Sequence, residues 1–98
     1  MISEMEYFGR GAYGIRTAAF AYFGEDIEQL DLAEVACLVG LPQQPARLDP
    51  ACFPEAAKAR RGFILRLMRG GGLITQEQMS AASLESFKVL PRKRGCPD

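Results

Sequence analysis

Apolar residues recur at helical spacing in several stretches of this 98-residue chain. The first stretch, residues 14–23, places four residues on one helix face at the i, i+3, i+4 and i+7 positions, namely Ile15, Ala18, Ala19 and Tyr22. Gly24 follows and suits a helix end in the left-handed conformation. The pattern therefore predicts a helix over residues 14–23.

Two pairs of polar residues mark further helix starts. Asp31 with Glu34, and Thr75 with Gln78, have the spacing of capping boxes, in which each side chain accepts a hydrogen bond from the other residue's backbone N–H. The first pair predicts a helix from residue 32 to about 39 that is apolar on nearly every side, as a buried helix is. The second pair predicts a helix that ends near residue 85. We assign Glu34 to capping rather than to general-base catalysis, because its position in the box explains it.

The longest predicted helix begins near Pro54, which suits the first helical turn, and ends at the glycine triplet 70–72. Its expected buried stripe consists of Ala57, Ile64, Leu67 and Met68. Arg60 falls on the same stripe. A guanidinium in that position needs a partner, because an unpaired buried charge is strongly unfavourable.

Composition excludes some classes of function. The 12 basic and 12 acidic residues balance, so charge gives no indication of nucleic-acid binding, and 48% hydrophobic residues is ordinary for a globular domain. No apolar run is long enough to cross a bilayer. Residues 1–6 carry acids where a secretory signal would carry bases, so we expect no targeting segment in this chain.

The chain has three cysteines and no histidine. Without histidine and without a close C-x-x-C pair, the sequence predicts no zinc site, and we expect no cofactor in this chain. The odd count argues against a disulfide framework. We expect Cys37 to be a small buried residue, and Cys52 and Cys96 to be thiols in a loop and in the tail.

A glycine-rich stretch precedes the first helix. Residues 9–14 read G-x-G-x-x-G, but a dinucleotide loop requires a preceding strand, and only six residues precede Tyr7. The stretch instead predicts a shaped loop at a helix N-terminus, where free backbone N–H groups can meet polar ligands.

Five blocks in unbroken order carry a family resemblance, namely YFGRGAYGI, TAAFAYFG, LDLAEVACLVGLPQQPARLDP, PEAAKARRGFIL and GLITQEQ. They resemble the second half of the transglycosylase domain (glycosyltransferase family 51) of class A penicillin-binding proteins. The resemblance implies an all-α, lysozyme-like fragment of about four helices with a proline-rich loop. Residues 1–90 would be the C-terminal part of a peptidoglycan transglycosylase domain, and residues 91–98 a basic tail.

The same resemblance implies a set of substrate-binding residues. Gln43 lies in the Pro-rich segment, residues 42–54, which lines the substrate cleft in the family, and Gly11 and Tyr13 lie in the glycine-rich loop. Arg60 and Arg61 match the last of the family's signature motifs. From the residues alone, Gln43 is equally explained as part of a rigid connector. For Arg60 a structural ion pair, with a carboxylate such as Asp49 or Asp31, is favoured over direct substrate contact.

The resemblance implies polymerisation of lipid-linked disaccharide (lipid II) into peptidoglycan at the extracytoplasmic face of the bacterial inner membrane. In the family, the catalytic glutamates stand in motifs that precede the glycine-rich loop, and those motifs are missing here. We therefore expect the isolated chain to be inactive. The expected partners are a lipid-linked disaccharide or glycan chain, the missing N-terminal half, and the membrane surface, with no nucleic acid. A divalent cation is possible in the complete enzyme. A non-catalytic binding or scaffold module, or a truncated remnant of the domain, is the alternative.

Overall fold

The computed structural model describes residues 6–91, 95 and 96, with the backbone but not the side chain of Gln43. It contains four α-helices, α1 (Ile15–Phe23), α2 (Leu32–Gly40), α3 (Pro54–Gly70) and α4 (Gln76–Ser83), and two short 3-10 helices, η2 (Ile27–Gln29) and η3 (Leu41–Gln43). Within the described residues there is no β-strand, only an isolated bridge between Tyr7 and Tyr13. The predicted all-α class is confirmed.

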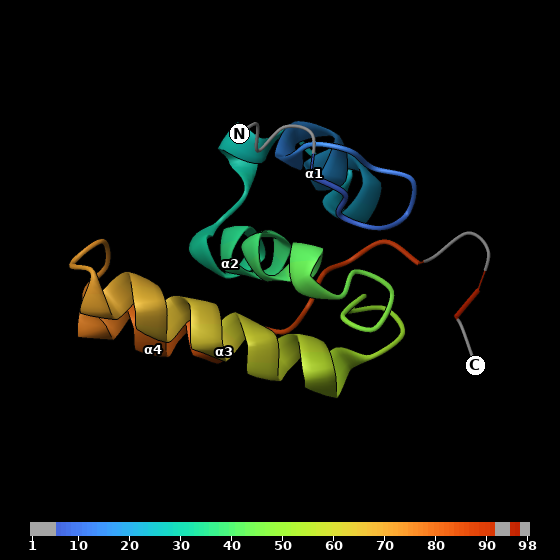
Figure 1. The fold of residues 1–98 in the computed structure, drawn as a ribbon. Coiled ribbons are helices and arrows are strands. Elements are labelled where there is room, and N and C mark those ends of the chain that lie inside the picture. Colours follow the sequence, from blue (N-terminus) through green and yellow to red (C-terminus); the bar gives the residue numbers. More distant parts are fainter. Residues whose placement is uncertain (1–5, 92–94, 97–98) are drawn as a thin grey trace.

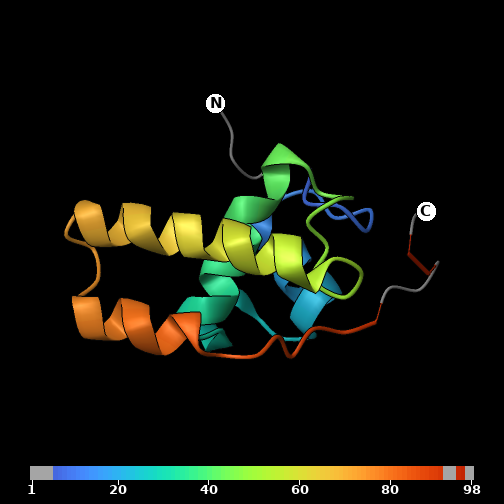
Figure 2. The same ribbon diagram turned by 90° about the horizontal axis from the view of Figure 1, so that it is seen from below.

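The helices are arranged in layers, with α2 in the middle. In Figure 1, α1 lies above α2, and α3 and α4 lie below it. Figure 2 shows α3 and α4 running side by side in opposite directions, joined by the turn around residues 71–75. α2 packs against α1 on one side and against α3 and α4 on the other, so it is the element that holds the fold together.

Each predicted helix boundary has its expected local cause. The Asp31 and Glu34 capping box at α2 and the Thr75 and Gln78 capping box at α4 are both formed in full. Pro54 occupies the first turn of α3. Gly24 ends α1 in the left-handed conformation, with φ of 70°.

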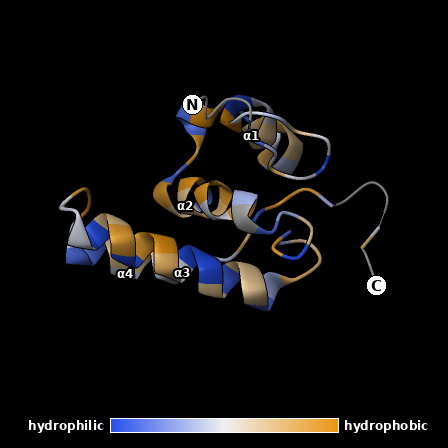
Figure 3. Cartoon of the chain, viewed as in Figure 1, coloured by the Kyte–Doolittle hydropathy of each residue, from blue (hydrophilic) through white to orange (hydrophobic). Residues whose placement is uncertain are grey.

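Two apolar clusters form the core. The first joins α1 and the glycine-rich loop to Cys37, Leu38 and Leu41, and the second joins Ala33 and Ala36 to α3 and α4. α2 supplies residues to both clusters, which explains why it is apolar on nearly every side (Figure 3).

The buried stripe of α3 differs from the prediction. Leu67 is 57% exposed, whereas Leu65 is fully buried, and the buried arginine is Arg61, with 1% exposure, rather than Arg60. The stripe faces α2 and α4 through Ala57, Arg61, Ile64 and Leu65. The sequence did not distinguish two stripes that differ by one residue, since each contains apolar positions at helical spacing.

The expectation for two of the cysteines is wrong. Cys52 and Cys96 form a disulfide, with their Cα atoms 5.4 Å apart. Cys37 is a buried free thiol, as predicted. The pairing was not visible in the sequence because the two residues are 44 positions apart. Only the return of the C-terminal segment, the described residues 84–91, 95 and 96, past α1 brings them together (Figure 1). The basic residues 92–94 of the predicted tail lie outside the described residues.

Candidate functional site

The glycine-rich loop, residues 7–14, folds back on itself ahead of α1. The isolated bridge pairs Tyr7 with Tyr13, and the Phe8 N–H donates to the Ala12 carbonyl over 2.9 Å. Four of its residues have positive φ, namely Gly9, Arg10, Gly11 and Gly14, with values from 53° to 87°. This run of left-handed conformations explains the density of glycine, which adopts them without the steric cost that other residues meet.

The loop presents an aromatic pair to solvent. The rings of Tyr7 and Tyr13 lie with centroids 4.9 Å apart at an interplanar angle of 43°, and Tyr13 is 61% exposed. The Gly11 N–H donates to the Tyr7 hydroxyl over 3.1 Å. A Cβ atom built on Gly11 meets no atom within 4 Å, so the space beside it is open. Exposed tyrosine rings with polar edges suit contact with a sugar or another amphipathic ligand.

Arg10 fixes this loop to the Pro-rich segment. Its Nε and Nη2 donate to the two carboxylate oxygens of Asp49, each over 2.8 Å, and its Nη1 donates to the Ala21 carbonyl over 3.0 Å. The guanidinium lies 4.3 Å from the centroid of the Tyr22 ring. A bidentate, largely buried pair of this kind is geometrically specific and holds two loops in one arrangement.

Tyr22 packs into the same cluster. Its hydroxyl donates to the Phe8 carbonyl over 2.5 Å, and the side chain is fully buried. Burial raises the pKa of the Tyr22 hydroxyl, and the nearby Asp49 carboxylate acts in the same direction. The hydroxyl is therefore neutral at physiological pH and serves as a structural hydrogen-bond donor.

Asp49 is the member of this cluster whose role the sequence misassigned. We expected it as a possible partner of Arg60, but it pairs with Arg10 and also accepts from the Ala51 N–H over 2.9 Å. Its exposure is 1%. No motif marks Arg10 as its partner in the sequence, because the two residues are 39 positions apart and α1 and α2 lie between them.

Arg60 belongs to α3, and its side chain reaches the junction between α2 and η3. Its Nε donates to the Gly40 carbonyl over 3.2 Å, and its guanidinium lies 5.0 Å from the centroid of the Phe63 ring. Gly40 is needed for this approach, since an added Cβ would lie 2.7 Å from the Arg60 Cγ. The side chain is half-buried and has no carboxylate partner among the described residues. Arg60 therefore contacts Gly40, the residue directly before η3. η3 ends at Gln43, whose side chain lies outside the described residues.

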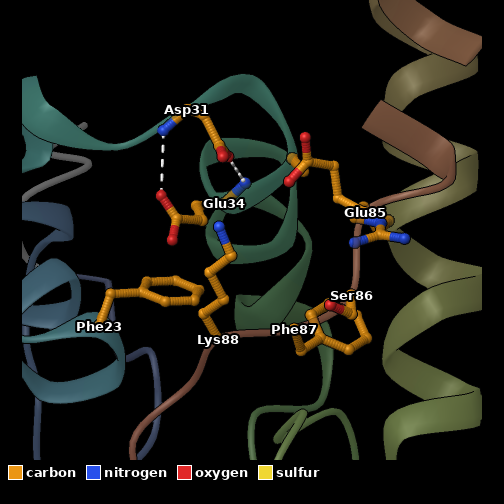
Figure 4. A pocket seen from close by; sticks show the side chains of 9 residues that line it. Phe23, Asp31, Glu34, Glu85, Ser86, Phe87 and Lys88 are labelled. Carbon is orange, nitrogen blue, oxygen red and sulfur yellow. Dashed lines mark hydrogen bonds between the residues drawn. The ribbon is translucent and has the colours of Figure 1, made fainter. Parts of the chain in front are cut away.

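Arg61 points away from Arg60. Its Nη2 donates to the Ser83 carbonyl over 3.2 Å, and its guanidinium lies 4.6 Å from the centroid of the Phe87 ring. Its Nε has no hydrogen-bond partner within the described part of the chain. A shallow pocket beside it is shown in Figure 4, where Glu34 and Lys88 point toward the same space. Burial raises the pKa of the Glu34 carboxyl.

The structure thus separates the predicted site residues into two groups. Gly11 and Tyr13 lie in one loop that Arg10 fixes to the Pro-rich segment, and Arg60 lies where that segment leaves α2. Arg61 instead faces α4 and the C-terminal segment. Adjacent helical residues project about 100° apart, so the two arginines of one motif have different environments.

Three carboxylates that the sequence offered as candidates already have partners. Asp31 and Glu34 cap α2, and Asp49 is paired with Arg10. Among the described residues, no cluster of three or more His, Cys, Asp or Glu side chains is arranged to hold a metal ion. The described part of the chain also contains no helix that is both long enough and apolar enough to cross a membrane.

A protein-family model described as Transglycosylase matches residues 4–69, which is about two thirds of the chain. The chain belongs to the transglycosylase family. The matched region contains the glycine-rich loop, the Pro-rich segment, and Arg60 and Arg61 of α3. The resemblance recognised in the sequence is thereby confirmed.

Individual relatives agree with this assignment. The chain is 45% identical over 76 residues to penicillin-binding protein 1A of Streptococcus oralis, covering 78% of this chain and 12% of that protein. It is 41% identical over 83 residues to a putative transglycosylase of Cupriavidus necator, covering 85% of this chain and 36% of that protein. The crystal structure of penicillin-binding protein 1A from Haemophilus influenzae matches with a TM-score of 0.82 and 30% identity, covering 86% of this chain and 12% of that chain. The chain therefore corresponds to a fragment of a transglycosylase domain, much shorter than these relatives.

Proposed function

We propose that this chain is the part of a peptidoglycan glycosyltransferase that positions a lipid-linked disaccharide during glycan polymerisation. Two observations carry the proposal. Arg10 and Asp49 join the glycine-rich loop to the Pro-rich segment, and the partly exposed Arg60 is held at Gly40, two residues before that segment. Family membership supports the reaction class, and the geometry supports the roles that we propose for individual residues.

The reaction joins the 4-hydroxyl of one sugar to the anomeric carbon of another and releases a lipid pyrophosphate. It requires a general base for the hydroxyl proton and cations for the charge that develops on the departing pyrophosphate. The Arg60 guanidinium is suited to the second task, because its planar fork matches phosphate oxygens and its Nη atoms pair with no carboxylate of the described residues. We assign Arg61 a supporting role, since it is buried against Phe87.

Tyr13 and Gly11 are suited to the saccharide. The exposed Tyr13 ring offers an apolar face and a hydroxyl, and the open space beside Gly11 allows a ligand to approach the backbone closely. We assign Gln43 to hydrogen bonding with a sugar or pyrophosphate oxygen, on the basis of its position in the Pro-rich segment. An amide offers both a donor and an acceptor for such contacts.

The general base belongs, in this proposal, to residues outside the described structure. Asp31, Glu34 and Asp49 are engaged as helix caps and as an ion-pair partner, which supports this division of labour. The isolated chain therefore binds ligand without polymerising it. A complete enzyme would act at the extracytoplasmic membrane surface, and any divalent cation would be held by groups elsewhere in it.

The test is calorimetric titration of the purified chain with a phosphoglycolipid transglycosylase inhibitor. We expect saturable binding that weakens about tenfold or more in Arg60→Ala and Tyr13→Ala, because each change removes a direct contact worth on the order of 1.4 kcal/mol or more. Arg16→Ala is the matched control, since Arg16 is exposed and pairs loosely with Asp26 over 3.7 Å. Equal affinities for the wild type and all three variants would refute the assigned contacts. Polymer formation by the isolated chain would refute the proposal that the general base lies outside it.

A further inference from the structure

We infer that the Cys52–Cys96 disulfide is a redox-controlled staple that holds the C-terminal segment against the helical body. This C-terminal segment consists of residues 84–91 together with Gly95 and Cys96. The inference rests on the route of this segment through the fold and on the exposure of the disulfide. It does not depend on the proposed function.

The C-terminal segment makes three successive attachments. Phe87 lies over the Arg61 guanidinium, and the Leu90 N–H donates to the Tyr22 carbonyl over 2.7 Å. Cys96 then bonds to Cys52. Figure 2 shows the segment leaving α4 and running along the lower edge of the molecule toward the C-terminal end. It therefore connects α4, α1 and the Pro-rich segment in sequence.

The third attachment, the disulfide, is made in the turn between Asp49 and the start of α3. Cys52 lies two residues before Pro54, the start of α3, and its N–H donates to the Asp49 carbonyl over 3.0 Å. Asp49 is the residue that holds Arg10. The disulfide thus fastens the C-terminal segment to the same turn that fixes the glycine-rich loop. The noncovalent contacts at Phe87 and Leu90 hold only the earlier part of the segment. The covalent bond at Cys96 therefore determines how firmly its end is held.

The disulfide is accessible to exchange, whereas the third cysteine is not. Cys96 is exposed and Cys52 is half-buried, so a small thiolate can reach the sulfur of Cys96. Burial raises the pKa of the Cys37 thiol to about 12, so this residue stays a protonated thiol and does not compete for either partner. The bond is therefore specific to one pair.

The exchange is a two-electron reaction with two molecules of a thiol reductant such as glutathione. One reductant thiolate attacks Sγ of Cys96, the bond between the two cysteine sulfurs breaks, and Cys52 leaves as a thiolate that takes up a proton. The second reductant thiol then displaces Cys96 as its thiol, and the reductant becomes a disulfide. In the opposite direction, a disulfide oxidant accepts the two electrons and the staple forms. Such bonds persist in oxidising compartments and are rare where thiol buffers dominate.

The test compares the oxidised and reduced full-length chain. The wild-type protein is equilibrated with oxidised or reduced glutathione, and its thiols are counted by alkylation in denaturant followed by peptide mass mapping. We expect one free thiol, at Cys37, after oxidation and three after reduction. Three free thiols after oxidation, or a different pairing, would overturn the inference.

The conformational part of the inference has its own readout. We expect reduction to lower the thermal midpoint by roughly 10 °C or more and to speed backbone hydrogen exchange in residues 84–91 and 50–53 about tenfold, with α2 unchanged. Cys96→Ser should match the reduced protein and show no further response to reductant. Cys37→Ala should keep the full response. Equal midpoints and exchange rates for oxidised and reduced protein would show that the bond does not control the segment.

Discussion

The carboxylate of Asp49 receives two hydrogen bonds of 2.8 Å from Arg10, a residue with φ of 53° in the glycine-rich loop. The ion pair connects two loops that lie on opposite sides of α1 and α2 in the sequence. A non-glycine residue in the left-handed region is strained, and it persists where surrounding contacts determine it. Here the contacts to Asp49, the Ala21 carbonyl and the Tyr22 ring provide that determination.

Removing Asp49 should destabilise the fold strongly. In Asp49→Ala the Arg10 guanidinium remains largely buried without its counter-ion, and we expect the free energy of unfolding to fall by roughly 3–5 kcal/mol. Urea unfolding followed by circular dichroism measures this change. Arg16→Ala, which removes an exposed pair, should cost less than about 1 kcal/mol. A loss of similar size in both variants would contradict the role given to Arg10 and Asp49.

Two glycines of the same loop should respond differently to alanine. An added Cβ at Gly9 would lie 2.5 Å from the Tyr22 hydroxyl and 3.1 Å from the Pro45 Cβ, whereas at Gly11 it would meet open space. Both positions have positive φ, so each substitution costs about 1–2 kcal/mol for conformation. We expect Gly9→Ala to cost at least about 1 kcal/mol more than Gly11→Ala, because of the added overlap. Thermal melts of the two variants would contradict this if they coincide.

The fold should lose stability at alkaline pH. Burial raises the pKa of Cys37 to about 12 and also raises that of Tyr22. A group with a raised pKa in the folded state stabilises the fold fully below its unfolded pKa, which is about 8.5 for cysteine and about 10 for tyrosine. The free energy of unfolding should therefore fall above about pH 8.5, by up to about 1.4 kcal/mol per pH unit for each group.

Urea unfolding at a series of pH values measures this dependence, and Cys37→Ala separates the two groups. Because that variant lacks the thiol, its stability should stay level until about pH 10, where tyrosine begins to ionise in the unfolded chain. An unchanged profile in Cys37→Ala would show that the buried thiol does not cause the loss.

The two neighbouring arginines of α3 should differ in their effect on stability. Arg61 is almost fully buried and packs against Phe87, so Arg61→Ala should cost roughly 2–4 kcal/mol through lost packing and cation–π contact. Arg60 is half-buried with one hydrogen bond to a carbonyl, and Arg60→Ala should cost about 1 kcal/mol. Chemical unfolding of both variants checks the order, and a reversed order would place the buried contact on the wrong arginine.

Local features of the fold were predictable from sequence, because they depend on nearby residues. The capping boxes at Asp31 and Thr75, the proline that opens α3 and the glycine that ends α1 act over a few positions, and all four are present. The prediction of the buried stripe of α3 was wrong by one residue. Arg60 and Arg61 both fit helical spacing, and only packing against α2 and α4 selects Arg61.

Long-range pairings were not predictable for a physical reason. The partner of Asp49 and the partner of Cys52 are each decided by how α1, α2 and the C-terminal segment are placed in space. Asp49 was expected as a possible ion-pair partner of Arg60 but pairs with Arg10, and Cys52 was expected to be a free thiol. Charge and cysteine count alone do not distinguish between partners that lie tens of residues apart.

The most direct test of the substrate-positioning role is chemical-shift mapping of the isotope-labelled chain during titration with the phosphoglycolipid inhibitor. We expect backbone amide shifts to concentrate in residues 9–14, in η3 and near Arg60, and to leave α4 unchanged. Shifts confined to α4 and the C-terminal segment, or no shifts up to millimolar inhibitor, would contradict the account. Shifts in the expected residues would mean that this fragment holds a real part of the glycosyltransferase substrate site.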